Sequence, residues 1–184
     1  MLMHSPNLFI VLEGLSGTGK TTIGKLLAER MCAEYCKTPH QLFEPFRKVI
    51  DSGADPNASL LFYLAGIFQS SAEISRMLQS RSVVCDRFVF TTLYYHKALG
   101  ATLEIPDSFL VRLANPDYTF LIVRDEQKRM RYLSVSHPDY ETPRRKTIDQ
   151  TLLAGYRKHG LPEIDNSKDN PIAAVEQILR HIDG

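Results

Sequence analysis

The sequence carries almost no net charge, because 22 lysines and arginines stand against 21 aspartates and glutamates and the formal charge at pH 7 is +1. Proteins that bind a nucleic-acid polymer usually carry a clustered excess of basic residues. The balance therefore predicts that a nucleic-acid polymer is not a partner. A small anionic ligand remains compatible with it, since such a ligand needs only a few local charges.

Cysteines and long hydrophobic runs are also scarce. The three cysteines, Cys32, Cys36 and Cys85, are odd in number and their spacings match no zinc site, so free thiols are the simplest interpretation. Cys32 and Cys36, four residues apart, leave a weak metal or redox pair open. The longest apolar stretches have only the length of strands, and residues 1–7 do not have the pattern of a secretion signal. We expect a cytoplasmic protein that has no membrane-spanning segment.

What the sequence does contain is a regular alternation of strand and helix patterns. Its 184 residues, 43% of them hydrophobic, predict a single domain spanning residues 1–184, with one sheet covered by helices. The apolar runs predict strands at residues 8–12, 33–37, 83–85, 118–123 and 163–165. The helical spacing predicts helices at residues 22–30, 44–52, 58–79, 88–99, 109–114, 126–133, 147–158 and 173–182. This order favours a doubly wound α/β fold with a parallel five-stranded sheet, whose ligands bind at the carboxyl ends of the strands.

The most informative motif follows directly after the first predicted strand. It reads Gly14-Leu15-Ser16-Gly17-Thr18-Gly19-Lys20-Thr21, the phosphate loop G-x-x-x-x-G-K-[ST]. Backbone N–H groups of such a loop cradle phosphate oxygens, and the helix that follows directs its N-terminal dipole at them. Lys20 is expected to reach the β- and γ-phosphates of ATP as a catalytic residue, and the Thr21 hydroxyl is expected to bind Mg²⁺. The predicted ATP site consists of Gly14, Ser16, Gly17, Thr18, Gly19, Lys20, Thr21 and Thr22.

A second motif, Asp86-Arg87, ends the strand predicted at residues 83–85. The carboxylate of Asp86 is expected at the carboxyl edge of the sheet, where it can face the phosphate loop and hold Mg²⁺ or a water bound to it. Arg87 offers a planar pair of donors to a phosphate. The alternative is an ordinary surface ion pair at a strand end. With a phosphate loop in the same chain, both residues are predicted to be catalytic.

Several segments together resemble thymidylate kinases. Residues 9–14 and 16–22 are similar to the opening of that family, and Asp86-Arg87-Phe88 is similar to its Asp-Arg-aromatic motif. Residues 115–118 resemble its entry into the fourth strand, and residues 163–167 resemble its last strand and adenine-side loop. The resemblance implies a P-loop NTPase fold and ATP-dependent phosphorylation of a nucleoside monophosphate, dTMP-like, to the diphosphate. It also implies nucleotide biosynthesis as the setting, and a homodimer through helices beside the sheet.

The polar, aperiodic stretch at residues 134–146, with Pro138 and Pro143, predicts a mobile loop that can serve as a lid. Phosphoryl transfer spreads negative charge over the migrating group, and an arginine that stabilises this charge has a large effect on rate. The phosphate loop itself carries no arginine. The resemblance implies that the lid supplies one, and Arg144 and Arg145 are the catalytic candidates. A solvated charge cluster is the alternative for either residue.

The resemblance also implies an acceptor site. Its candidate substrate-binding residues are Arg47 and Arg87 for the phosphate, Phe62 for packing against the base, and Thr92 and Tyr95 for the nucleoside. From helical spacing alone, Phe62 is equally well explained as a core residue, and Tyr95 as a half-buried helix residue.

The chain departs from thymidylate kinases at three places. The Arg-Glu-Pro-Gly sequence that is common after their second strand has no match, since residues 37–39 read Lys-Thr-Pro and residues 43–46 read Phe-Glu-Pro-Phe. Gly66 stands where the family carries an arginine that contacts thymine, and Ser16 replaces an acidic residue, so the acceptor base is left open. A kinase for a nucleoside or another small alcohol remains an alternative, with Glu44 or Asp86 as the base that accepts the hydroxyl proton. A regulatory P-loop NTPase is less favoured, because the sequence lacks the Asp-x-x-Gly and Asn-Lys-x-Asp motifs of such switches.

Overall fold

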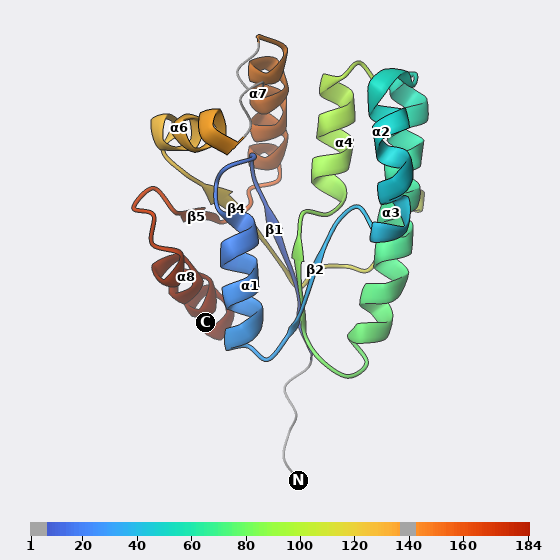
Figure 1. Ribbon diagram of the computed structural model, residues 1–184. Helices are drawn as coiled ribbons and strands as arrows, with labels where there is room; N and C mark the ends of the chain where they lie inside the picture. The colour runs from blue at the N-terminus through green and yellow to red at the C-terminus, as the bar shows by residue number, and fades with distance from the viewer. Residues whose placement is uncertain (1–6, 137–142) are drawn as a thin grey trace.

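The computed structural model describes residues 7–136 and 143–184. Within them, one sheet lies at the centre of the molecule and every strand pairing in it is parallel (Figure 1). The strands are β1 (Phe9–Glu13), β2 (Glu34–Lys37), β3 (Val83–Asp86), β4 (Tyr118–Val123) and β5 (Glu163–Asp165), in the spatial order β2-β3-β1-β4-β5. The doubly wound five-stranded sheet predicted from the sequence is confirmed.

The central strand β1 is buried on both faces, which explains its nearly continuous apolar sequence. Ile10 and Leu12 point into a core cluster on one face, whereas Phe9 and Val11 point into a second cluster on the other. This alternation follows from the two-residue period of a strand. As a result, β1 delivers the chain to the carboxyl edge of the sheet with its position fixed from both sides.

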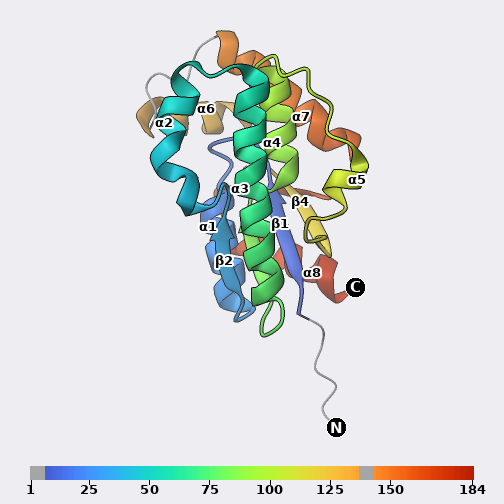
Figure 2. The same cartoon turned by 90° about the vertical axis from the view of Figure 1, so that its right-hand side faces the viewer.

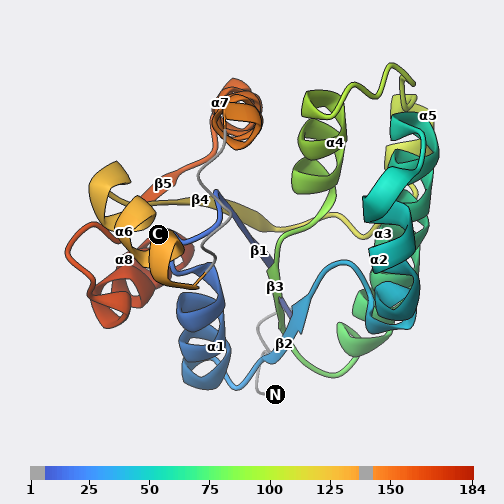
Figure 3. The ribbon, with the colours of Figure 1, turned by 45° about the horizontal axis from the view of Figure 1, so that its top comes forward.

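Helices cover both faces of the sheet. α1 (Lys20–Arg30) and α8 (Pro171–Asp183) pack on one face, while α3 (Pro56–Met77), α4 (Val89–Ala98) and α7 (Pro143–Lys158) lie on the other (Figure 3). The remaining elements are η1 (Gln41–Phe43), α2 (Glu44–Gly53), α5 (Asp107–Leu110) and α6 (Glu126–Ser136). The part of the chain that the structure describes contains no helix suited to crossing a membrane. All three cysteines are free thiols.

α2 is one of the helices that contribute no buried residue. It lies beside α3 (Figure 2), and its apolar side chains stay accessible. Its apolar side chains Phe46 and Val49 are 59% and 72% exposed. Polar contacts attach it to α3, where the hydroxyl of Tyr63 accepts a hydrogen bond from Arg47 and donates one to Asp51.

Helices extend into both ends of the stretch that was predicted as a lid. α6 continues to Ser136 and α7 already begins at Pro143, so the prediction of an irregular loop is wrong at both ends of residues 134–146. Proline suits the first position of a helix, where no N–H is needed, and the arginine and lysine residues that follow are good helix formers. Residues 137–142, including Pro138, lie outside the described residues.

Close packing between α4 and α7 leads to a prediction about stability. Gly155 of α7 lies against the ring of Tyr94, and a Cβ there would overlap the ring carbons. The ring has little freedom to move, because the Tyr94 hydroxyl lies 2.6 Å from Nε2 of His159. We expect Gly155→Ala to lose about 3 kcal/mol to the overlap, which exceeds the ~1 kcal/mol that alanine gains in a helix. The melting temperature should therefore fall by about 4 to 8 °C.

Gly53→Ala is the matched control for this substitution. No described atom lies within 4 Å of the position that its Cβ would take, so the same exchange should leave the melting temperature unchanged or raise it. Thermal melts followed by circular dichroism would measure both variants. An unchanged melting temperature in Gly155→Ala would show that Tyr94 moves aside without cost.

Candidate active site

The phosphate loop connects β1 to α1 and owes its shape to its glycines. Gly19 has a φ of +97°, and a Cβ on it would lie 2.5 Å from Nδ2 of Asn166. The same amide nitrogen donates a hydrogen bond of 2.9 Å to the carbonyl oxygen of Thr18, and the Thr18 hydroxyl donates to that of Leu15. Asn166 follows β5, so the end of a distant strand holds the loop in place.

Lys20 lies at the first position of α1 and is 5% exposed. Its Nζ donates a hydrogen bond of 2.6 Å to the carbonyl oxygen of Leu15. Burial, reinforced by the charge of Arg87, lowers the pKa of Lys20 well below its usual value. An anion placed between these two cations would lower the cost of keeping both charged. The electrostatics of the loop therefore suit a phosphate group.

Asp86 and Thr21 form an oxygen-rich pair beside the loop. Asp86 is 1% exposed, and its Oδ2 accepts hydrogen bonds from the hydroxyls of Thr21 at 2.6 Å and Tyr35 at 3.2 Å. Its Oδ1 is buried and has no partner among the described residues. A buried carboxylate oxygen of this kind calls for a donor or a cation. The interpretation of Asp86-Arg87 as a surface ion pair is therefore wrong for Asp86.

These oxygens are the ligands that a hard divalent cation prefers. Within residues 7–136 and 143–184, no group of three or more His, Cys, Asp or Glu side chains could hold a metal ion. Mg²⁺ does not need such a cage, because it is usually bound by one or two carboxylates together with substrate phosphates and waters. Thr21 and Asp86 fit that pattern.

Arg87 follows β3 in the left-handed backbone region, with a φ of +70°. This conformation costs about 1 kcal/mol for a residue with a Cβ. Its guanidinium donates to the Gly14 carbonyl at 2.9 Å and to the hydroxyls of Thr91 and Ser16 at 3.2 and 3.4 Å. Glu13, fully buried, accepts hydrogen bonds from the backbone N–H groups of Phe88 and Thr91 and from the Thr91 hydroxyl. These hydrogen bonds of Arg87 and Glu13 connect the phosphate loop to the start of α4.

Two cavities meet at this point. One, of about 500 Å³, extends over the phosphate loop, and the other, of about 420 Å³, lies between α2, α3, α4 and α7. Both are lined by Ser16, Lys37 and Arg87. The first is also lined by the predicted residues Gly17, Gly19, Lys20, Thr21, Thr22 and Asp86. Gly14 and Thr18 instead contribute to the loop through the hydrogen bonds described above.

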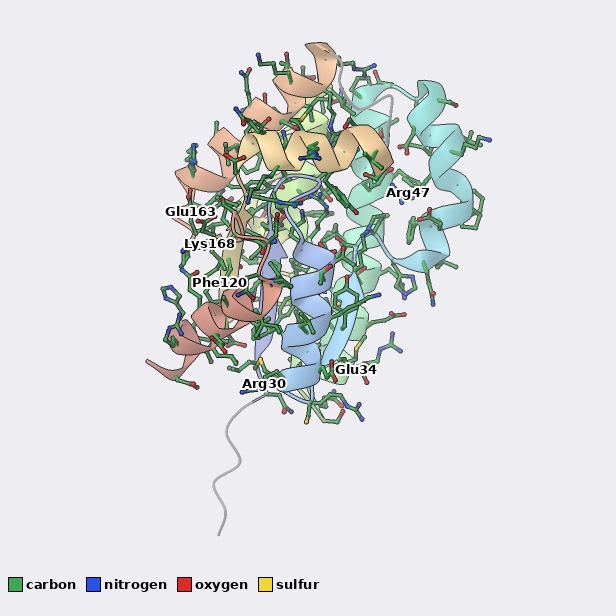
Figure 4. All side chains as sticks on the ribbon, turned by 60° about the vertical axis from the view of Figure 1, so that its left-hand side comes forward. Arg30, Glu34, Arg47, Phe120, Glu163 and Lys168 are labelled. Carbon is green, nitrogen blue, oxygen red and sulfur yellow. The ribbon has the colours of Figure 1, made fainter. Side chains whose placement is uncertain are left out.

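The second cavity contains most of the predicted acceptor residues. Arg47, Thr92 and Tyr95 line it together with Arg87. Arg47 projects from α2 (Figure 4), where its Nη1 donates a hydrogen bond of 2.9 Å to Glu44. Its guanidinium carbon lies 5.7 Å from the centroid of the Tyr63 ring. A cationic group therefore stands on each side of this cavity.

Phe62 lies elsewhere. Its ring packs edge-on against Phe43, with centroids 5.4 Å apart, and it is not among the described residues that line the cavity. The next residue, Tyr63, lines it instead. One position along a helix turns a side chain by about 100°. The position of Phe62 therefore does not support the base-packing role predicted for it, and its neighbour Tyr63 is the aromatic residue of α3 that lines the cavity.

The two arginines predicted from the lid occupy different positions in the structure. Nη2 of Arg145 donates a hydrogen bond of 3.3 Å to the Ser16 hydroxyl, and its guanidinium carbon lies 5.7 Å from the centroid of the Tyr95 ring. Arg145 lines the second cavity. Arg144 is exposed and lines neither cavity. Both residues belong to the first turn of α7, so its rotation determines which arginine faces the phosphate loop.

Two further arginines contact the phosphate loop and were not predicted. Arg129 of α6 is buried, donates a hydrogen bond to the Ser16 carbonyl and lies 2.9 Å from Asp149 of α7. Arg124 donates one to the Gly17 carbonyl. Arg124 directly follows β4, as Arg87 follows β3, so the rule of looking beyond strand ends could have identified it. The sequence holds no comparable signal for Arg129.

Comparisons with known proteins agree with this geometry. A family model described as thymidylate kinase matches residues 12–161. A probable thymidylate kinase of Methanocaldococcus jannaschii is 28% identical over 182 residues, which cover 97% of this chain and 95% of the relative. Another, of Methanococcus vannielii, is 33% identical over 128 residues, which cover 68% of this chain and 65% of the relative.

Solved structures show the same architecture. The thymidylate kinase of Ehrlichia chaffeensis superposes with a TM-score of 0.71 at 21% identity, covering 97% of this chain and 100% of that one. That of Candida albicans has a TM-score of 0.73 at 18% identity, covering 97% and 92%. These structures confirm the P-loop NTPase fold, and the family model spans most of the chain. The protein belongs to the thymidylate kinase family, whose members transfer phosphate from ATP to a nucleoside monophosphate.

Proposed function

We propose that the 500 Å³ cavity holds the triphosphate of ATP and the 420 Å³ cavity holds a dTMP-like nucleoside monophosphate. The observation that carries this assignment is their meeting point, because Arg87, Ser16 and Lys37 line both. Two anionic groups bound on either side would approach each other there. Holding both reactants in line is the main task of an enzyme that transfers a phosphoryl group.

On the donor side, Gly14, Ser16, Gly17, Thr18, Gly19 and Thr22 form the binding loop in this proposal, and Lys20 contacts the β- and γ-phosphates. Thr21 and Asp86 would hold Mg²⁺, in keeping with the unpartnered Oδ1 of Asp86. When bound, Mg²⁺ neutralises charge on the phosphates. Because the Asp86 carboxylate is buried and bonded to Thr21, it is already oriented for that role.

On the acceptor side, we assign Arg47 and Arg87 to the phosphate and Thr92 and Tyr95 to the nucleoside. An acceptor phosphate is already ionised, so it needs no general base. We assign Phe62 to supporting the wall of the cavity through Tyr63, since the centroids of the two rings lie 5.5 Å apart and Tyr63 lines the cavity.

Arg145 is the cation that we assign to the transferring group, in preference to Arg144. It reaches Ser16 of the phosphate loop and also lines the acceptor cavity, so it stands at the boundary of the two proposed sites. Closing this boundary with α6 and α7 would exclude water and limit idle hydrolysis of ATP.

A kinase for nucleosides is the second candidate, and the geometry favours it less. It would need a carboxylate that accepts a hydroxyl proton. Glu44 pairs with Arg47 at 2.9 Å and does not line the acceptor cavity among the described residues. Asp86 lines the cavity over the phosphate loop and, among the described residues, does not line the acceptor cavity. A regulatory NTPase would leave the acceptor cavity without a role.

The proposal can be tested by measuring ATP consumption in the presence of Mg²⁺ with each of a panel of nucleoside monophosphates and the matching nucleosides as acceptors. The products would be identified by mass. We expect a diphosphate from at least one monophosphate, because four cationic side chains line the acceptor cavity. Monophosphates formed only from nucleosides would establish the second candidate. ATP hydrolysis that no acceptor stimulates would overturn the kinase assignment.

The wider setting follows from the family and is likewise proposed. We infer one kinase domain over residues 1–184, in the cytoplasm, which acts on a small nucleotide and not on a nucleic-acid polymer. A homodimer through α3 is the proposed assembly, and the exposed Leu61 on that helix is compatible with it.

A further inference from the structure

Lys37 is the last residue of the edge strand β2 and lies beside Asp86 in the sheet register. Side chains alternate between the two faces of a strand, so Lys37 shares its face with Tyr35, whose hydroxyl bonds Asp86. Lys37 also lines both cavities, as only Ser16 and Arg87 do among the other described residues. Its side chain therefore stands where the proposed ATP and acceptor sites meet.

The ammonium group of Lys37 has no protein partner among the described residues. Within the same ranges, every other lysine or arginine that lines either cavity is hydrogen-bonded to the protein. These bonds are Lys20 to Leu15, Arg47 to Glu44, Arg87 to Gly14, Arg124 to Gly17 and Arg145 to Ser16. Lys37 is exposed to solvent, so all three N–H donors of its ammonium are available to a ligand.

The charges at this junction suit anionic groups. Burial does most to lower the pKa of Lys20, and the charges of Arg87 and Lys37 act in the same direction. The charge of Lys37 therefore extends to the phosphate loop. Phosphate groups bound on both sides of the junction would repel each other, and a cation between them offsets that repulsion.

Lys37 and Arg145 come from opposite sides of the central strand. β2 lies on one side of β1 in the sheet, and β4 lies on the other. α7, which carries Arg145, packs on β4 through Leu152 and Leu121. Two cations that belong to different elements are thus placed on either side of the point where the cavities meet.

We propose that Lys37 is a further catalytic residue, which bonds both the acceptor phosphate and the γ-phosphate of ATP and holds the two anions together. This inference rests on the proposed function. In the transfer, an ionised oxygen of the acceptor phosphate forms a bond to the γ-phosphorus. The bond from that phosphorus to the β,γ-bridging oxygen breaks, its electron pair stays on ADP, and no proton leaves the acceptor. Lys37 offsets the repulsion between the attacking and the transferred group.

The test measures how strongly each substrate favours binding of the other. Calorimetric titration gives the Kd of dTMP with and without a non-hydrolysable ATP analogue and Mg²⁺, and the ratio of the two values is the coupling factor. A cation that bonds both phosphates increases this factor, so we expect Lys37→Met to lower it about tenfold. The kcat/KM for dTMP should fall about 100-fold. Lys37→Arg keeps the charge and should recover part of both losses.

Lys48→Met is the matched control, because this exposed lysine of α2 follows Arg47 but lines neither cavity. Its coupling factor and kcat/KM should stay within about twofold of the wild type. A folded Lys37→Met enzyme with the wild-type coupling factor would overturn the inference and leave the proposed function intact, because Lys37 would then contact one substrate at most. A wild-type enzyme that phosphorylates no monophosphate would overturn the proposed function and the inference with it.

Discussion

Lys20→Met is expected to lower kcat for phosphoryl transfer by about 10³-fold, because it removes a buried cation from the site where charge develops on the transferred group. The fold should survive the change. Burial already disfavours the charged form of Lys20, as its lowered pKa shows, and methionine has a similar length without the charge. We therefore expect a melting temperature equal to or above that of the wild type. Loss of activity combined with retained stability is the signature of a catalytic role.

Steady-state kinetics with saturating ATP and acceptor, together with a thermal melt, would measure both quantities. Lys158→Met is the control, since this exposed lysine lies in the last turn of α7 and lines neither cavity. Its kcat should stay within about twofold of the wild type. A Lys20→Met enzyme with wild-type kcat would exclude Lys20 from the transfer step.

Arg145→Met is expected to reduce kcat by a similar factor, about 10³-fold, whereas Arg144→Met should change it by less than about twofold. The two arginines are neighbours on the same turn of α7, but only Arg145 reaches Ser16 and the acceptor cavity. Comparing kcat for the two variants therefore distinguishes the effect of position on the helix from the effect of net charge, since each variant removes one positive charge from the same segment.

Single-turnover measurements with bound ATP and acceptor would report the transfer step itself. Binding of ATP should be affected less than kcat, because an arginine that stabilises a developing charge acts mainly in the transition state. Equal losses in the Arg144 and Arg145 variants would contradict the assignment and indicate a general electrostatic effect of α7.

Much of the proposed donor site could be predicted from the sequence, because its chemistry is local. The phosphate loop is contiguous and its strand and helix lie on either side of it, so Lys20 and Thr21 follow from the motif. Asp86 could be assigned to the same edge because the carboxyl ends of parallel strands meet there. In the structure, the Thr21 hydroxyl lies 2.6 Å from the Asp86 carboxylate.

The acceptor site was harder to predict, because it depends on how helices are rotated. Phe62 and Tyr63 are adjacent, as are Arg144 and Arg145, and in each pair only one member lines the cavity. Helical periodicity identifies an apolar face but does not say which face meets a neighbouring element. Arg129 reaches the Ser16 carbonyl only because α6 packs against the phosphate loop, which is distant in the sequence. The prediction of an irregular loop at residues 134–146 is wrong at its C-terminal end because Pro143 and the charged residues that follow it suit the first turn of a helix.

The weak attachment of α2 bears on how new specificities arise in this fold. The helix supplies Arg47 and Asp51 to the acceptor cavity, yet it contributes no residue to the core. Substitutions at exposed positions usually change stability by less than about 0.5 kcal/mol. Mutations in α2 can therefore explore different acceptors while the sheet and the phosphate loop stay intact. Because α2 lies outside the core, it is the segment through which laboratory evolution would redirect this enzyme at least risk to folding.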